Sequence, residues 1–228
     1  MKKLLYLFLL VLIGCTISQK IVYETDDLSA HQTIKPIPAA VEVRIFKDNR
    51  ASIKENEIVL YNPRQIILDG VQTCVNSEKH YKKDTVVNQI SRILVEHFNK
   101  ARLFNVSFYN HSPYSNYLLT GTLNSFYCEQ EYSSSAAFGS LFGLVGALAT
   151  AGIKTPARIV IDISDLKLYK KDGTLVKDFG NFYKEYKDDF KVDANCWCVY
   201  WNANAMLKDF NTHLTEKIRN DLAGIEFK

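Results

Sequence analysis

The chain has 228 residues, of which 47% are hydrophobic, and it carries 28 basic and 25 acidic side chains. A net charge of +3 excludes a typical nucleic-acid-binding domain, because such domains present a strongly basic patch. The length and the thirteen phenylalanines and thirteen tyrosines fit one domain with a sizeable core.

The N-terminus predicts a secreted, lipid-anchored protein. Two lysines precede an apolar run from Leu4 to Ile13, which is typical of a signal peptide and too short for a spanning helix of about 20 residues. Residues 12–15 read "LIGC" and resemble the lipobox of bacterial lipoproteins. That resemblance implies removal of residues 1–14 and acylation, including palmitate, of Cys15. An ordinary signal peptide with a chance cysteine is the alternative.

The lipobox also sets the expected location. Several acyl chains on Cys15 would form a stable membrane anchor. Thr16 follows Cys15 where the enterobacterial inner-membrane signal has an aspartate, which implies the outer membrane, with the protein facing the periplasm. Because two lysines leave with the signal peptide, the mature chain is nearly neutral.

The first mature segment predicts a tether that leads into a strand. Residues 15–39 are polar and hold two prolines without sustained periodicity, as expected of a linker. Alternation over 40–46 predicts a half-buried strand with Glu42 and Arg44 on its polar face. "KDNR" (47–50) predicts a turn. Two short β-rich runs that follow, at 57–61 and 65–69, predict edge strands or an extended loop.

The rest of the chain alternates between clear helical and strand patterns. Asp84 is the expected N-cap of an amphipathic helix, and Gly224 is the expected stop after the last helix. Gly121 predicts a bulge or a close approach within a strand, and an Asp-Gly pair predicts a hairpin. The elements are a helix over 85–102, strands over 103–109, 115–132, 157–171 and 175–190, and a helix over 203–222.

Two amphipathic helices need one sheet face against which to bury their apolar sides. We therefore expect an α+β fold: a two-layer sandwich of a mainly antiparallel sheet with both helices on one face. Residues 40–228 are expected to form this single domain, with an apolar insertion at about 133–154 between two of its strands.

The insertion carries no charged residue from Tyr132 to Ile153. As a helix it would extend about 33 Å, enough for a hydrocarbon core of about 30 Å. One crossing would separate two strands expected in one sheet, so topology argues against a single span. A buried core helix is the alternative to a surface that contacts a partner protein or lipid. The expected contact residues are Phe138, Leu141, Phe142, Leu144, Val145 and Leu148.

Four further cysteines predict disulfides: Cys74, Cys128, Cys196 and Cys198. An even number in an exported chain favours disulfide pairing, and four cysteines allow three connectivities. Only Trp197 separates the last two, so a bond between them would close a strained ring. We expect one or two long-range bonds from Cys74 and Cys128 to the "CWC" segment. A soft-metal site is the alternative, but no histidine lies near "CWC", so neither metal nor another cofactor is expected.

Catalytic motifs are missing from the sequence. It contains no HExxH zinc pattern, no GxSxG nucleophile elbow and no P-loop. His97 and His213 fall on predicted helices at or near apolar faces, where histidines mostly pack. Aromatic residues are dense at 104–132 and 179–190, and they favour a sheet core over a lipid or glycan groove. We expect no enzyme activity and assign no catalytic residue.

The order of these patterns resembles a known group of lipoproteins. A lipobox and a tether precede the strand "VEVRIF", the helix "VVNQISRILVEHFNKARLF", the phrase "NYLLTGTLNSFY" and the hairpin "DGTLV". This order, over about residues 40–222, is similar to the auxiliary lipoproteins of ABC-type (MCE-linked) transporters and related small outer-membrane lipoproteins. It is distantly similar to the curli secretion lipoprotein.

The resemblance implies a non-catalytic accessory lipoprotein that faces the periplasm and assists envelope lipid transport by binding partner proteins. The alternative is an oligomeric secretion or assembly lipoprotein whose apolar insertion contacts the outer membrane. A secreted enzyme with an unrecognised cleft is the third hypothesis. The expected partners are the membrane, through the Cys15 lipid, a protein of an envelope transport or secretion complex, and further copies of the chain. Nucleic acid is not among them.

Overall fold

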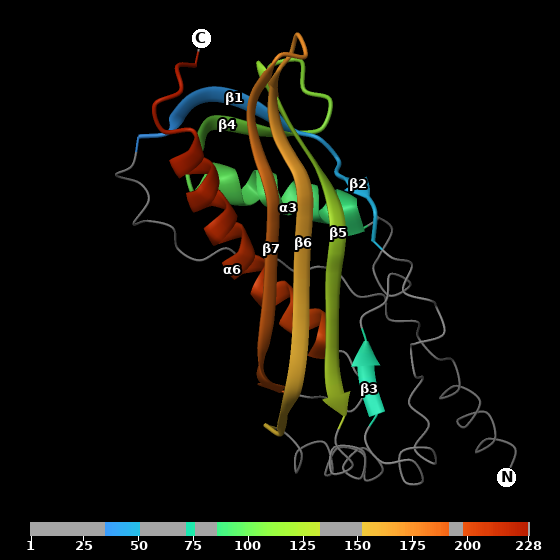
Figure 1. Ribbon diagram of the computed structural model, residues 1–228. Coiled ribbons are helices and arrows are strands. Elements are labelled where there is room, and N and C mark those ends of the chain that lie inside the picture. Colours follow the sequence, from blue (N-terminus) through green and yellow to red (C-terminus); the bar gives the residue numbers. More distant parts are fainter. Residues whose placement is uncertain (1–34, 51–71, 76–85, 133–151, 192–197, 228) are drawn as a thin grey trace, which may run out of the picture.

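One long, twisted β-sheet with both helices against the same face forms the fold of the computed structural model (Figure 1). The structure describes residues 35–50, 72–75, 86–132, 152–191 and 198–227. The strands are β1 (Ile37–Val43), β2 (Lys47–Asp48), β3 (Gln72–Val75), β4 (Phe104–Tyr109), β5 (Tyr117–Tyr132), β6 (Lys154–Lys170) and β7 (Leu175–Lys191), and the helices are α3 (Val86–Lys100) and α6 (Cys198–Asp221).

The sheet is ordered β4-β1-β5-β6-β7, and β5 lies at its centre. One edge of β5 pairs antiparallel with β6, and its other edge pairs with β1, β2 and β3 in turn. The predicted two-layer α+β class is confirmed. The sequence did not reveal that β1 pairs parallel with both β4 and β5. Parallel neighbours need a crossover connection, and α3 lies in the one between β1 and β4.

Apolar side chains at helical spacing explain why α6 lies on the sheet. Leu207, Phe210 and Leu214 are fully buried, and Phe210 meets Phe182 of β7 edge-on with ring centroids 4.9 Å apart. Burial of each such side chain stabilises the fold by about 1.5–3 kcal/mol. In α3 the buried face includes Ile90, Leu94 and other residues of the same core. The two predicted amphipathic helices are therefore confirmed.

Gly121 marks both a bulge and a close approach, as predicted. The register between β5 and β6 shifts between Thr120 and Thr122. A Cβ atom at Gly121 would lie 3.3 Å from both the Leu166 side chain and the Phe46 ring. The backbone of β5 can bend over these two buried side chains only because glycine has no side chain of its own. Gly224, with a φ of 86°, likewise lies just past α6 as expected.

The prediction of a turn at "KDNR" (47–50) is wrong for residues 47 and 48. Lys47 and Asp48 form β2, which pairs parallel with Thr122 and Leu123 of β5. Buried Phe46 holds the chain against the core at this point, and the backbone N–H of Asn49 donates to the Leu123 carbonyl at 2.9 Å. The chain thus follows the edge of β5 beyond the end of β1.

The prediction that Glu42 lies on a solvated strand face is also wrong. Its side chain is 1% exposed, because the segment between β4 and β5 folds over it. The Glu42 carboxylate accepts hydrogen bonds from the backbone N–H groups of His111 at 2.7 Å and Ser112 at 3.1 Å. It also accepts one from the Ser115 hydroxyl at 3.2 Å and pairs with Arg44 at 2.6 Å. A buried carboxylate is stable there because donors surround it.

Element boundaries differ modestly from the predictions. The first strand begins at Ile37, inside the segment assigned to the tether, and α6 begins at Cys198, before the predicted 203. The runs at 57–61 and 65–69 and the N-cap residue Asp84 lie outside the described residues. Within the described ranges, no helix combines the length and the apolar character that a membrane crossing requires.

Candidate functional site: a charged pocket at one end of the sheet

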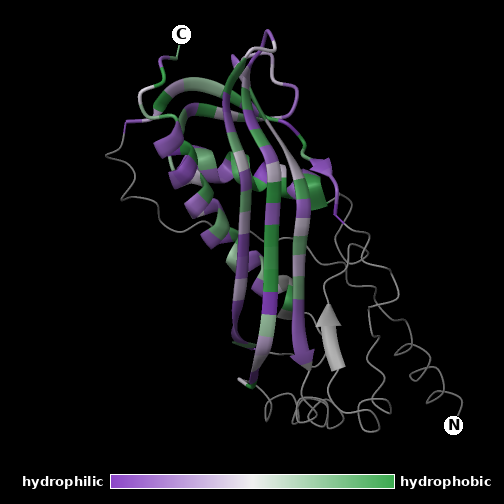
Figure 2. Ribbon diagram, in the orientation of Figure 1, coloured by the Kyte–Doolittle hydropathy of each residue, from purple (hydrophilic) through white to green (hydrophobic). Residues whose placement is uncertain are grey.

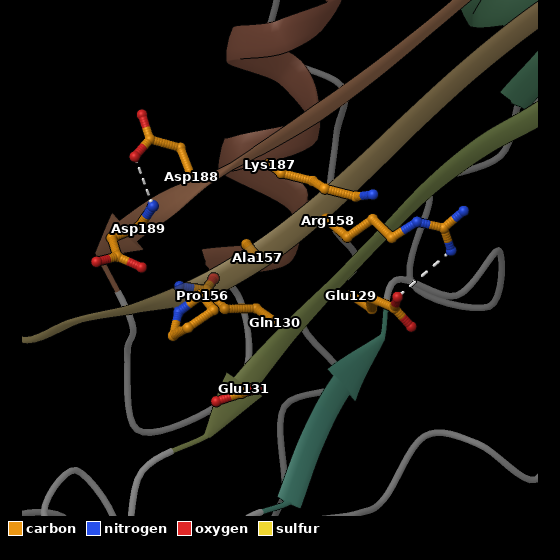
Figure 3. Close-up of a pocket in the computed structure, with 9 residues that line it drawn as sticks. All are labelled: Glu129, Gln130, Glu131, Pro156, Ala157, Arg158, Lys187, Asp188 and Asp189. Atoms are coloured by element: carbon orange, nitrogen blue, oxygen red, sulfur yellow. Dashed lines mark hydrogen bonds and ion pairs between the residues drawn. The ribbon is translucent and has the colours of Figure 1, made fainter.

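A pocket of about 440 Å³ lies where β5 ends and β6 begins (Figure 3). Three consecutive residues from each of three neighbouring strands line it: 129–131 of β5, 156–158 of β6 and 187–189 of β7. The strand register aligns Glu129, Arg158 and Lys187 across the sheet. Hydrophilic residues are concentrated at this end of β5 and β7 (Figure 2).

Arg158 is the centre of an ion-pair network on the face of the sheet away from the helices. Its Nε donates to Glu185 Oε1 at 2.6 Å, and its guanidinium also reaches Glu129 at 3.5 Å. The Tyr127 hydroxyl donates to the other oxygen of Glu129 at 2.7 Å. Lys187 adds a second cation 3.1 Å from Glu185. The network therefore connects all three strands through charged side chains.

These contacts fix the charges of the network. The hydrogen bond from Arg158, together with one from Lys187, lowers the pKa of Glu185 to about 2. The hydrogen bond to Glu185 in turn raises the pKa of Arg158. A general acid or base works best with a pKa near the operating pH, and both groups are moved away from neutrality. The arrangement suits electrostatic recognition of a partner better than proton transfer.

Gln130 forms a second network on the helix-facing side of the same strands. It is 1% exposed, and its Nε2 donates to the Phe190 carbonyl at 2.8 Å and to the Thr155 hydroxyl at 3.1 Å. Its Oε1 accepts from Asn202 of α6 at 2.8 Å. One buried side chain thus joins β5, β6, β7 and α6. These bonds hold together the strand ends that line the pocket.

The rim of the pocket is acidic. Glu131, Asp188 and Asp189 line it, and none of them forms an ion pair with another described residue. Asp188 accepts a hydrogen bond from the backbone N–H of Asp189 at 2.7 Å (Figure 3). These carboxylates offer sites for cationic groups of a ligand or partner, whereas Arg158 is already paired with Glu185 and Glu129.

Several of the predicted site residues lie outside the described part of the chain. These are the lipidation site Cys15, the disulfide candidate Cys196 and the six predicted contact residues Phe138, Leu141, Phe142, Leu144, Val145 and Leu148. For Cys74 and Cys198 the structure describes the backbone only. The lipidation and contact assignments therefore stay predictions.

The backbones of three predicted disulfide residues come to the pocket end. Cys74 of β3 pairs with Gln130, and buried Cys128 lies two positions before Gln130 on β5. Cys198 opens α6, the helix whose Asn202 bonds Gln130. The predicted bonds between β3 or β5 and the "CWC" segment stay predictions, because Cys196 lies outside the described residues.

The apolar segment leaves and re-enters the sheet beside this pocket. It follows Tyr132, the last residue of β5, and β6 begins at Lys154. Because β5 and β6 are antiparallel neighbours, both ends of the segment belong to the same end of one sheet. This confirms the premise that the two flanking strands belong to one sheet, which argues against a single membrane crossing between them.

Sequence reasoning missed Gln130, Arg158 and Glu185. The alternation of β6 places Arg158 on the polar face, but its partners lie 29 positions before it and 27 after it in the chain. Only the strand register brings them together, and a single sequence contains no signal for that register. Among the described residues no group of three or more His, Cys, Asp or Glu side chains could hold a metal ion.

Comparisons with known proteins leave the family open. No family model matches the chain, and no curated protein matches it. Among solved structures, the chain is similar to the crystal structure of a Xanthomonas campestris protein of the DUF330 family, with a TM-score of 0.49 and 10% identity. The match covers 91% of this chain and 98% of the other. At that score and identity, the likeness establishes neither a common fold nor a function.

Proposed function

We propose that this protein is a lipid-anchored, periplasm-facing accessory lipoprotein that assists envelope lipid transport by binding a partner protein at the pocket end of its sheet. The lipobox-like residues before Cys15 support the anchor. The fixed charges around Arg158 support binding, because they offer recognition without a group poised for proton transfer.

The observation that carries the proposal is the distance between the tether and the pocket. The tether enters β1, and Val41 of β1 pairs with Tyr117 at the start of β5. The pocket lies near Gln130 at the other end of β5. At about 3.3 Å per residue, these two ends of the sheet are about 43 Å apart.

The length of the tether then favours one orientation. Residues 15–36, as a flexible coil, have a root-mean-square span of only about 26 Å. This is shorter than the sheet, so an anchor at Cys15 keeps the β1 end nearest to its own membrane. The pocket and the ends of the apolar segment then face away from that membrane. In this orientation they are more accessible to a partner protein than to the lipid around the anchor.

The alternative function requires the opposite orientation. An assembly lipoprotein that inserts the apolar segment into its own membrane must bring the pocket end to the lipid. A fully extended tether of residues 15–36 would reach about 73 Å, so this is allowed, but at the entropic cost of stretching the tether.

Site-specific photocrosslinking in cells tests the proposal. A photoreactive phenylalanine analogue would replace exposed Asp189 at the pocket rim, with Leu175 as the control at the other end of the sheet, where it is 50% exposed. We expect a protein adduct from an envelope transport complex at Asp189 and none at Leu175. Adducts with lipid alone at Asp189 would favour the alternative, and equal protein adducts at both positions would contradict the proposed site. Loss of labelling by a palmitate analogue in C15A would test the anchor separately.

A further inference from the structure

The strand β7 is an edge strand of unusual length. It has 17 residues, stands at the end of the sheet order, and pairs only with β6 among the described residues. A long edge exposes backbone N–H and C=O groups that can pair with another strand. We propose that β7 pairs antiparallel with β7 of a second copy of this chain, with Tyr186 on the two-fold axis. The inference is independent of the proposed function.

The side chains of β7 are self-complementary about Tyr186. In this register Lys184 faces Asp188 of the second copy, and Glu185 faces its Lys187. Phe182 faces Phe190 of the second copy, and each of these pairs occurs twice by symmetry. Facing pairs of opposite charge and facing aromatic pairs both stabilise antiparallel strands, whereas like charges destabilise them.

Neighbouring positions for the axis are electrostatically unfavourable. An axis at Lys184 or Lys187 would place that lysine against its own copy, and an axis at Glu185 or Asp188 would place two carboxylates together. Of the five positions from 184 to 188, only Tyr186 places no ionised side chain against itself and no like charges in the flanking pairs. Antiparallel register is set by such patterns of facing side chains.

The geometry of β7 is compatible with a continuous sheet. Phe182 and Tyr186 face α6, since Phe182 packs on Phe210 and the Tyr186 hydroxyl donates to Asp209 at 2.8 Å. In the proposed register, each residue of β7 whose side chain faces α6 lies opposite a residue of the second copy whose side chain also faces α6. The helices of both copies therefore lie on the same side of the joined sheet. Gly180, with a φ of 71°, marks the register shift that limits the pairing to 181–191.

In many proteins a charged side chain on an edge strand prevents pairing with other strands, especially when it points inward. Lys184 has this placement, because its side chain lies toward Asp209 of α6. Here its position is opposite Asp188 of the second copy, so the same lysine favours a second β7 and disfavours strands that lack this acidic residue. The charge pattern therefore selects one occupant, a second copy of the chain.

Charge reversal in the full-length protein in mild detergent tests the pairing. D188K places lysine against Lys184 twice, and sedimentation should show a rise in the dimer dissociation constant of about tenfold or more. The double variant K184D/D188K restores opposite charges, and we expect its dissociation constant to return to within about threefold of the original. D189K is the matched control, because Asp189 faces Tyr183 of the second copy. Circular dichroism checks that each variant is folded.

A disulfide on the axis tests the register itself. Facing residues in antiparallel strands have Cα atoms about 4.5–5.5 Å apart, which suits a disulfide. Y186C should therefore form a crosslinked dimer on oxidation. D188C should not, because that residue lies about 13 Å from its own copy along the strand. A chain that stays monomeric at every concentration, a D188K dimer as tight as the original, or equal crosslinking of the two cysteine variants would overturn the proposal.

Discussion

Replacement of Gln130 gives the sharpest test of what holds the pocket end together. Q130M keeps most of the side-chain volume but removes every hydrogen bond of the amide. Three of those bonds are 3.1 Å or shorter, to Phe190, Thr155 and Asn202, and the site is fully buried. A net value of about 1 kcal/mol for each bond predicts a loss of about 3 kcal/mol in the free energy of unfolding.

Urea unfolding followed by circular dichroism measures this loss, with all variants in the same oxidation state. The neighbouring variant E131Q is the control, because Glu131 forms no described ion pair, and its effect should stay within about 0.5 kcal/mol. The smaller side chain in Q130A should cost more than Q130M, since it adds a cavity to the lost bonds. If Q130M unfolds within about 0.5 kcal/mol of the original protein, the network does not hold the strands as inferred.

Three further predictions concern the buried carboxylate, the ion-pair network and the cysteines. E42Q should lower the free energy of unfolding by about 2–3 kcal/mol in urea, because an amide cannot satisfy the donors that surround Glu42, and an unchanged midpoint would contradict its role. The contribution of Glu185 should be fully present above its ordinary pKa of 4.5 and be lost as the pH falls toward about 2, since folding lowers this pKa. In R158Q an NMR titration should find the pKa of Glu185 raised toward its ordinary value, and the same low pKa in both proteins would refute the assigned cause. Peptide mapping without reduction should find the two-cysteine "CWC" peptide linked to the β3 or β5 peptide, and free thiols at all positions would exclude the predicted disulfides.

Periodicity was sufficient to predict the elements that bury a continuous apolar face. The spacing of Leu207, Phe210 and Leu214 predicts α6, and the alternation of Ile159, Ile161 and other β6 residues predicts a strand, since each pattern follows from local backbone geometry. The same local patterns also placed Gly121 at a bulge, because a glycine inside a strand usually has such a reason.

The polar networks could not be predicted, because they depend on which strands are neighbours. Glu42 alternates with apolar residues as a solvated side chain would, and only the fold of the 110–116 segment over it makes it buried. Arg158 has the same local pattern as any exposed strand residue, and its partners come from β5 and β7. The parallel pairing of β1 was missed for the same reason, since it is a property of the crossover and not of the strand.

The two proposals constrain one another through the direction of β7. Antiparallel pairing about Tyr186 places the two pockets near the axis, with Asp188 of one copy about 13 Å from Asp188 of the other along the shared edge, and places the two tether ends of the sheet at opposite ends of the pair. Because each predicted tether, as a flexible coil, would span about 26 Å on average, we expect a paired sheet anchored in one membrane to lie along the surface.

In the proposed orientation a single copy has its pocket away from the membrane, so pairing would change what the pocket faces. The disulfide of Y186C provides a way to hold the paired state, and D189C labelling in the same chain would report access to the pocket rim. On vesicles, we expect a membrane-bound collisional quencher to reach a fluorophore at Asp189 more strongly in the crosslinked pair than in the reduced protein. Equal quenching in both states would show that pairing and orientation are not coupled, even if both proposals are separately correct.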